Sequence, residues 1–362
     1  MIHRTWPIVA CCLSFGFVTA RGAQIETLAG SGAQGFSGDG GPARSAELHG
    51  PTGLIRGPDG TVYFCDTDNQ ALRKVLPDGV ISTIAGDNHR GYSGDGGPAN
   101  RARLNEPFEV RLDSDGNLVF CERLNHVIRR IDARTATIST IAGTGKPGFS
   151  GDGGPATQAT FKEPHSIQFG PDGSLYVCDI GNSRIRRIDM KTGIVSSFAG
   201  NGQRKPTPDG APFASSPLNG PRAIDFDPQG NLWVALREGN AVYKLDLHTG
   251  MAHLMAGGGK KGVPGNGGPA RSAALSGPKG LTVGPDGSVY LADTESHTIR
   301  RIDPKTGIID VFAGTGERGD GPDGPPTACK LSRPHGLFAA ADGDVFIGDT
   351  ESNKIRVVRS GR

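Results

Sequence analysis

The sequence predicts an all-β fold, a β-propeller with six blades, and three observations support this prediction. Six segments of the chain align with one another without gaps, and their starts lie 56 or 57 residues apart. Each segment contains four short runs of strand-forming residues, separated by turns rich in glycine and aspartate. No stretch after the first two dozen residues has helical periodicity of useful length. Four-stranded units at a fixed step are typical of propeller blades.

Each repeat is expected to run from an innermost strand to an outermost strand. The repeats start near residues 51, 107, 164, 221, 278 and 334. In the fifth repeat the first run is GLTV, a PDG turn follows, and the second run is VYLAD. A turn then leads to the third run, TIRRID, and a KTG turn leads to the fourth, IIDVFAG. The Asp-Gly turns predict hairpins, so neighbouring strands should pair antiparallel.

The two ends of the chain are expected to meet in the last blade. The sixth repeat ends after its third strand, whereas QIETLAG at residues 24–30 matches the fourth-strand run VISTIAG at residues 80–86. If residues 24–30 complete the last blade, the ring closes and no sheet edge is left open there. This assigns residues 24–362 to one propeller domain.

The N-terminal segment is typical of an export signal. Arg4 precedes an apolar run at residues 7–20, which is too short to span a membrane comfortably. Cleavage is expected after Ala20 or Ala23, so residues 1–23 are assigned to a signal peptide and the protein is expected to be secreted or periplasmic. An uncleaved anchor and a lipoprotein signal at Cys11 are the alternatives. No other run could cross a membrane after the signal is removed.

Charge and cysteine content exclude some classes of protein. The 39 Lys and Arg residues nearly balance 37 Asp and Glu residues, so no nucleic-acid partner is expected. Cys65, Cys121 and Cys178 occupy one repeated position, which is a poor geometry for a disulfide. We expect these residues and Cys329 to be buried free thiols, and we expect the protein to be a monomer.

The connection between blades contains a glycine motif that resembles a nucleotide site. GSGAQG at residues 30–35 has the G-x-G-x-x-G spacing of a dinucleotide-binding turn, but the same spacing recurs at residues 143, 257 and 314. A nucleotide fingerprint is expected once, between a strand and a long helix. The repeated copies instead predict chain reversal between blades.

Two acids and one base also recur in the repeats. The acid of the connecting loop stands three residues before a proline, at Asp39, Asp95, Asp152, Asp209, Asn266 and Asp323. A second acid closes the second strand, at Asp66, Glu122, Asp179, Asp293 and Asp349, and Leu236 replaces it in the fourth repeat. The third strand carries a basic row, placed at Arg73, Arg129, Arg186, Lys244, Arg300 and Arg356. One carboxylate per loop favours structural turns over a ring of calcium sites. The basic row is expected to be solvated or to form ion pairs between blades.

The repeat signature P-x-G-(I/L)…DG-x-(V/L)-Y-(V/L)-x-D-x-x-N-x-x-I-R resembles the NHL repeat, which occurs in bacterial secreted proteins, teneurins and ubiquitin-ligase subunits. The resemblance covers nearly all of the chain after the signal. It implies a six-bladed NHL propeller. It implies no single activity, because one fold hosts unrelated functions.

One repeated position varies sharply in chemistry, and it supplies the candidate ligand-binding residues. It follows the proline that starts each innermost strand and holds Thr52, Phe108, His165, Arg222, Lys279 and His335. These residues are expected to line the mouth of a central channel. The next position is Gly, Ser or Ala in five repeats and Glu109 in the second, so Glu109 joins the candidates.

Two histidines at this position resemble those of the peptidylglycine amidating lyases, which are six-bladed propellers. The carrying segments are Pro164-His165-Ser166 and Pro334-His335-Gly336. In that family such histidines hold a catalytic zinc from three alternate blades, so the resemblance implies a divalent metal at His165 and His335, helped by Glu109. This chain has two such histidines, on opposite blades, and the arginine and tyrosine of the lyase reaction have no counterpart. The sequence itself requires no cofactor.

Three functions remain open from the sequence. The first is a binding module whose mouth takes a small anionic ligand or a protein. The second is a metal-dependent lyase or lactonase-like hydrolase at the channel, and the third is a structural interaction protein of the cell envelope. No Ser-His-Asp or Cys-His arrangement is visible, which favours a protein that is not an enzyme.

Overall fold

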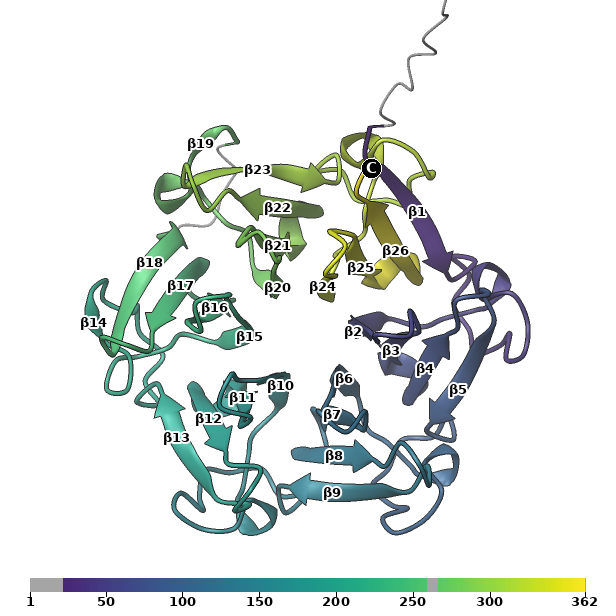
Figure 1. Cartoon of the computed structure of the whole chain (residues 1–362), viewed down its shortest axis with the longest axis horizontal. Coiled ribbons are helices and arrows are strands. Elements are labelled where there is room, and N and C mark those ends of the chain that lie inside the picture. The colour runs from purple at the N-terminus through teal and green to yellow at the C-terminus, as the bar shows by residue number, and fades with distance from the viewer. Residues whose placement is uncertain (1–21, 259–265, 362) are drawn as a thin grey trace, which may run out of the picture.

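The structure is a computed structural model that describes residues 22–258 and 266–361. Six antiparallel sheets stand around a common axis like the blades of a propeller (Figure 1), which confirms the predicted fold. The described helical segments are short 3-10 turns. The predicted signal peptide at residues 1–23 lies almost wholly outside the described residues.

The strands are numbered along the chain, and each blade runs outward from the axis. The innermost strands are β2 (Pro51–Arg56), β6 (Pro107–Leu112), β10 (Pro164–Phe169), β15 (Pro221–Phe226), β20 (Pro278–Val283) and β24 (Leu337–Ala339). The second strands are β3 (Val62–Asp66), β7 (Leu118–Glu122), β11 (Leu175–Asp179), β16 (Leu232–Leu236), β21 (Val289–Asp293) and β25 (Val345–Asp349). The third strands are β4 (Ala71–Val75), β8 (Val127–Ile131), β12 (Arg184–Ile188), β17 (Ala241–Asp246), β22 (Thr298–Ile302) and β26 (Lys354–Arg359). The outermost strands are β5 (Ile81–Ala85), β9 (Ile138–Ala142), β13 (Val195–Ala199), β18 (Met251–Gly257), β23 (Ile308–Ala313) and β1 (Gln24–Ala29). We call the sheet that begins with β2 blade 1, and the others follow in order to blade 6, which begins with β24.

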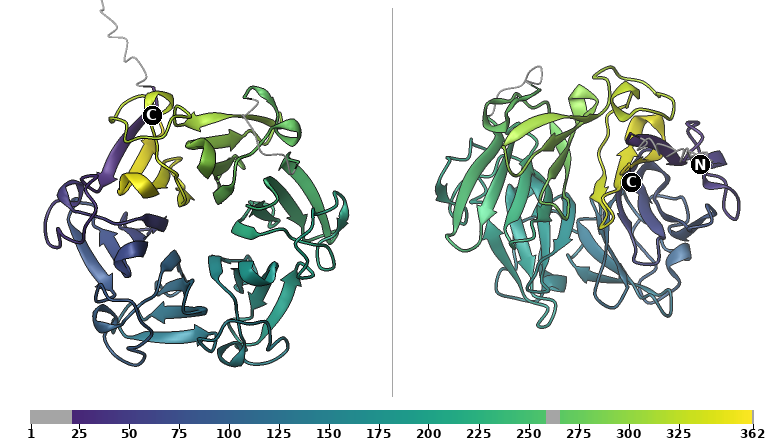
Figure 2. Two further views of the ribbon diagram at one scale, coloured as in Figure 1. Left: turned by 180° about the vertical axis from the view of Figure 1, so that it is seen from behind. Right: turned by 45° about the horizontal axis from the view of Figure 1, so that its top comes forward.

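The ring is closed by the N-terminal strand, as predicted. β1 pairs antiparallel with β26, from Gln24 opposite Arg359 to Ala29 opposite Ile355. Figures 1 and 2 show the purple start of the chain beside its yellow end in one blade. Two connecting loops also cover the outer edge of a blade. In blade 4, β14 (Ala211–Pro212) pairs with β18, and in blade 5, β19 (Gly268–Pro269) pairs with β23. Covered edges protect the sheets from pairing with other chains.

The hydrophobic core lies between neighbouring blades. One cluster joins Leu54 and Phe64 of blade 1 to Phe346 and Ile355 of blade 6, and all four side chains are buried. Five further clusters join the other blade faces in the same way. The four described cysteines after the signal are free and buried, as expected for small apolar side chains in these layers.

The first glycine of the repeated G-x-G-x-x-G motif has a purely structural role. Gly143 ends the outermost strand of blade 2 with φ of 95°, and a Cβ atom there would lie 2.5 Å from the carbonyl oxygen of His126. Gly30, Gly86, Gly200, Gly257 and Gly314 repeat this close approach in the other blades. Glycine is required because the backbone is left-handed and touches the next strand.

A buried arginine ties the blade to its connecting loop in five of the six blades. In blade 2 the guanidinium of Arg129 is fully buried, and its Nη atoms lie 3.1 Å from Glu122 and 2.6 Å from Asp95. Arg129 also donates a hydrogen bond to the carbonyl oxygen of Ser93, at 3.1 Å. The row therefore forms ion pairs and is not solvated, but the pairs lie within a blade and the loop that leads into it, and the expected pairing between blades is wrong. The loop acid Asp95 serves the same pair, which fits its predicted structural role.

Blade 4 lacks this ion pair because both partners are replaced together. The strand register places Tyr243, and not Lys244, opposite Val234 at the buried position, so the predicted place of Lys244 in the row is wrong. Leu236 stands where the acid would be. The hydroxyl of Tyr243 donates a hydrogen bond to the carbonyl oxygen of Thr207 at 2.6 Å. Thr207 stands 36 residues before Tyr243, as Ser93 stands 36 residues before Arg129, so the two hydrogen bonds occupy equivalent places in their blades. Replacing both charges avoids an unpaired buried charge and keeps the backbone acceptor satisfied.

Candidate ligand-binding site

In blades 1 to 5 a β-bulge lies at the start of the innermost strand, at the variable residue, whereas in blade 6 the strand begins only after His335. In blade 2, Pro107 pairs with Glu122 and Glu109 pairs with Cys121, so Phe108 is the extra residue. The same skip leaves Arg222 and Lys279 unpaired in blades 4 and 5. Bulges re-aim side chains and are common beside functional sites. The backbone thus decides where the variable side chain lies, and the residue type in each blade decides what that side chain can bind.

Five of the six variable residues meet across the axis. We call Phe108, His165, Arg222, Lys279 and His335 the central cluster. The Phe108 ring lies 3.6 Å from the His165 ring and 6.1 Å from the His335 ring, measured between centroids. The Arg222 Cζ atom lies 5.6 Å from the Phe108 centroid. Phe108 of blade 2 therefore touches or faces residues of blades 3, 4 and 6, and side chains fill the axis at this level.

The sixth variable residue, Thr52, has a structural role. Its hydroxyl donates to the carbonyl oxygen of Phe108 at 2.9 Å and lies 2.6 Å from the hydroxyl of Thr67. Thr52 is buried, and these bonds join blade 1 to the backbone that carries Phe108.

The side chain of Glu109 contacts Arg111 and does not join the central cluster. It forms an ion pair with Arg111 on its own strand. Burial raises its pKa to about 7, against the lowering effect of Arg111. Among the residues that the structure describes, no three His, Cys, Asp or Glu side chains gather closely enough to hold a metal ion. The structure therefore does not bring His165, His335 and Glu109 together as a metal site.

The two histidines of the cluster are neutral at physiological pH. Burial, and then the nearby Arg222, hold the pKa of His165 well below its usual range. Burial, and then Lys279, do the same for the pKa of His335. The Nε2 atom of His335 accepts a hydrogen bond from the Lys279 ammonium at 3.0 Å. Both ring nitrogens of His165 are buried and find no hydrogen-bond partner within residues 22–258 and 266–361.

The two cations of the cluster differ in how they are compensated. Lys279 lies 3.4 Å from Glu295, but that carboxylate is shared with Arg333 at 2.6 Å. Arg222 has no carboxylate within 4 Å in the described part of the chain, and its buried Nε atom has no hydrogen-bond partner there. Burial, followed by the repulsion of Arg237, lowers the pKa of Arg222 to about 9. Burial and then Arg222 lower the pKa of Lys279 to about 8.

Charged residues in a strained backbone conformation surround the cluster. The residue before the starting proline is left-handed in all six blades, and three blades supply glycine there. The other three supply Glu106, Glu163 and Arg333, with φ of 53°, 54° and 45°. Such conformations cost about 1 kcal/mol or more for residues other than glycine. Glu106 pairs with Arg123, and Arg333 pairs with Glu351 at 3.0 Å, so these side chains form a charged rim.

This rim was not predicted from the sequence, although the sequence contains a signal for it. Glycine at the same place in three repeats indicated a left-handed backbone, which makes charged residues in the other three notable. Residues other than glycine in a left-handed conformation cluster at functional sites.

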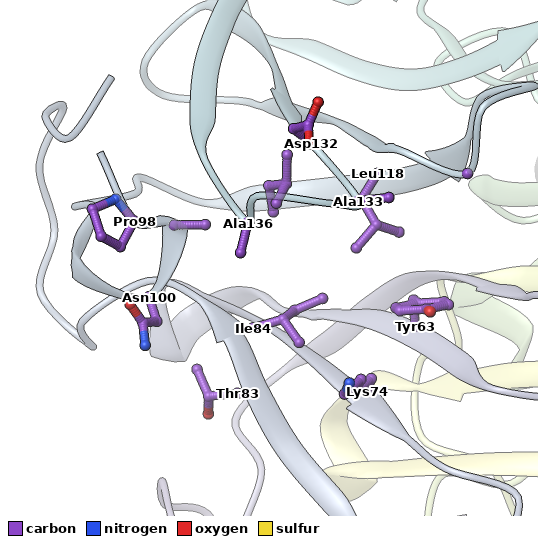
Figure 3. A pocket seen from close by; sticks show the side chains of 13 residues that line it. Tyr63, Lys74, Thr83, Ile84, Pro98, Asn100, Leu118, Asp132, Ala133 and Ala136 are labelled. Atoms are coloured by element: carbon purple, nitrogen blue, oxygen red, sulfur yellow. The ribbon is translucent and has the colours of Figure 1, made fainter. Parts of the chain in front are cut away.

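Pockets also lie in the seams between blades, away from the cluster. Figure 3 shows the one between blades 1 and 2, with a volume of about 460 Å³, where Tyr63 and Ile84 face Leu118 and Ala133. Similar pockets of about 660, 600 and 360 Å³ lie at the seams between blades 2 and 3, 4 and 5, and 6 and 1. These pockets recur at several seams, so they result from the packing of neighbouring blades. They therefore do not identify a ligand-binding site in any one blade. Nothing in the described helical segments is long and apolar enough to span a membrane.

Comparison with known proteins agrees with this architecture. The family model described as "NHL repeat" matches residues 275–302, in blade 5. The chain is 30% identical to Protein SUPPRESSOR OF QUENCHING 1, chloroplastic, of Arabidopsis thaliana over 71% of its own length and 25% of that protein. It is 26% identical to NHL repeat-containing protein 2 of Homo sapiens over 82% of its length and 44% of that protein. The chain thus spans less than half the length of these curated relatives.

Solved structures share the fold at low sequence identity. An auxiliary nutrient binding protein from Bacteroides thetaiotaomicron superposes with a TM-score of 0.67 at 17% identity, covering 94% of this chain and 77% of that one. This likeness shows the propeller fold alone. The match to the NHL repeat and the similarity to an NHL repeat-containing protein, in a ring of six blades, place this chain in the NHL-repeat β-propeller family.

Proposed function

We propose that this propeller is a binding protein whose central cluster takes a small organic anion. The observation that carries the proposal is the uncompensated guanidinium of Arg222. The five arginines of the buried row each lie within 4 Å of a carboxylate, whereas Arg222 has none within that distance in the described residues. A partly buried cation without a counter-ion is costly, and an incoming anion would offset that cost.

The balance of charge supports an anion over a cation as the ligand. The cluster holds two cations, and the carboxylate that lies 3.4 Å from Lys279, that of Glu295, is already shared with Arg333. The two histidines are neutral, so they add no charge and offer one donor each. A carboxylate between Arg222 and Lys279 would receive charge-assisted hydrogen bonds from both.

Acetate titrated into the purified protein at constant ionic strength, followed by ligand-observed NMR, tests this proposal. We expect Arg222→Gln to weaken binding by at least about tenfold, because a hydrogen bond to a charged group contributes about 1.5–3 kcal/mol. Arg187→Gln is the matched control, since Arg187 pairs with Asp172 on an outer part of blade 3 and is remote from the cluster. Equal affinities for the wild type and Arg222→Gln would refute the proposal.

We further propose that the protein acts outside the cytoplasm. Arg4 and the apolar run at residues 7–20 support export. Fractionation of expressing cells, with N-terminal sequencing of the product, tests this. Recovery of a cytoplasmic product that still begins at Met1 would contradict it.

A further inference from the structure

We infer that the anion is an aromatic carboxylate, an acid group carried on a flat ring, and this inference rests on the proposed function. Three rings lie beside the two cations of the central cluster. The site has the N–H donors of Arg222 and Lys279, but it also places the hydrocarbon ring of Phe108 at its centre, a surface that a simple hydrated anion would not use.

The geometry around Phe108 provides a ring-binding surface next to an acid-binding one. Phe108 is the one aromatic hydrocarbon side chain among the six variable residues. Its ring is nearly parallel to that of His335, with an interplanar angle of 29°, and tilted by 33° to that of His165. Phe108 and His335 are partly exposed, while His165 is 1% exposed. A ligand ring could therefore contact the exposed parts of Phe108 and His335, whereas His165 offers almost no exposed surface.

The cations lie where the acid group of such a ligand would fall. Arg222 Cζ is 5.6 Å from the Phe108 centroid, and Lys279 donates to the ring of His335. A ring stacked on Phe108 or His335 would thus hold its carboxylate within reach of both cations. The planar guanidinium of Arg222 suits a planar carboxylate, because it can donate two parallel hydrogen bonds.

The same surroundings disfavour other anions. Phosphate or sulfate at this place could also accept hydrogen bonds from Arg222 and Lys279, but one side of the ion would lose hydration against the Phe108 ring, which offers no donor. An aliphatic carboxylate would keep the ion pair but lose the offset or edge-on ring contacts, which are worth about two- to tenfold in affinity.

Matched ligands separate the contribution of the ring from those of charge and apolar area. Benzoate, cyclohexanecarboxylate, acetate, inorganic phosphate and benzylamine are titrated into the purified protein at constant ionic strength. We expect benzoate to bind two- to tenfold more tightly than cyclohexanecarboxylate, which has the same charge and similar bulk without a π system. We expect acetate and phosphate to bind more weakly still, and benzylamine not to bind.

Variants then assign the effect to residues. Phe108→Leu should reduce the preference for benzoate over cyclohexanecarboxylate to about onefold. Arg222→Gln should weaken the binding of both ring acids equally. Equal affinity of the wild type for benzoate and cyclohexanecarboxylate, or tighter binding of phosphate, would overturn the aromatic inference and leave the anion site standing. Failure of every carboxylate to bind the wild type would overturn the proposed function as well. The wild-type comparison decides the question even if Phe108→Leu does not fold.

Discussion

The buried ion pair of blade 2 can be converted into the uncharged pair that blade 4 already uses, and the cost should depend on the order of the changes. In Arg129→Tyr the fully buried Glu122 loses the cation 3.1 Å away. At an effective dielectric constant of about 20, that attraction is about 5 kcal/mol. Part of the loss is recovered by protonation of Glu122, whose pKa burial already raises to about 7. We therefore expect destabilisation of about 3–5 kcal/mol.

The double variant Arg129→Tyr with Glu122→Leu should recover much of this loss. Neither charge is then left buried, and the tyrosine hydroxyl can bond the carbonyl oxygen of Ser93, as Tyr243 bonds that of Thr207. We expect a coupling energy of about 2–3 kcal/mol in favour of the double variant. Guanidinium unfolding followed by circular dichroism measures all four proteins. Additive losses in the double variant would refute the idea that the two residues of blade 4 compensate each other.

Three further predictions concern the rim, the cluster and the connection. Glu163→Gly should raise the free energy of unfolding by about 1 kcal/mol, since glycine adopts the left-handed backbone without strain; a loss of stability in the same denaturant assay would show that the Glu163 side chain outweighs that strain. Anion binding should weaken as pH rises above 8, by up to about tenfold per unit, because the ligand favours protonated Lys279 and its pKa lies near 8; a flat affinity between pH 7 and 9.5 in NMR titrations would exclude Lys279 as a partner. Gly143→Ala should lower the melting temperature markedly, because the new Cβ would lie 2.5 Å from a carbonyl oxygen. Gly153→Ala is the control, because it has open space around it and should lower the melting temperature only through its positive-φ strain. Equal shifts of the melting temperature in the two variants would contradict the close approach at Gly143.

The fold could be predicted from the sequence because every blade repeats the same strand-forming runs and the same turn residues. The turn residues, the step of 56 or 57 residues and the additional strand at residues 24–30 each predict the same closed ring of six blades. Register inside the basic row was harder to predict, because two cations stand side by side in strands such as β8. Arg129 faces inward and Arg130 does not, so alignment by charge chose Lys244 where alignment by strand register selects Tyr243.

The candidate site was located by its variability, but its internal geometry depends on side-chain reach. Repeat spacing could place Phe108 at the axis. It could not show that the ring extends to His165, nor that Arg222 is left without a carboxylate while Lys279 has one. Those facts depend on how far each side chain extends from a β-bulge, and a repeat pattern carries no information on that distance.

The central claim is that Arg222 and Lys279 together receive the acid group of a small ligand. A crystal structure of the protein soaked with benzoate tests it most directly. We expect a carboxylate within hydrogen-bond distance of both Arg222 and Lys279, with the ligand ring against Phe108 or His335. Benzoate bound only in a seam between blades, or a central cluster in which Arg222 pairs with a carboxylate of the protein itself, would contradict this claim.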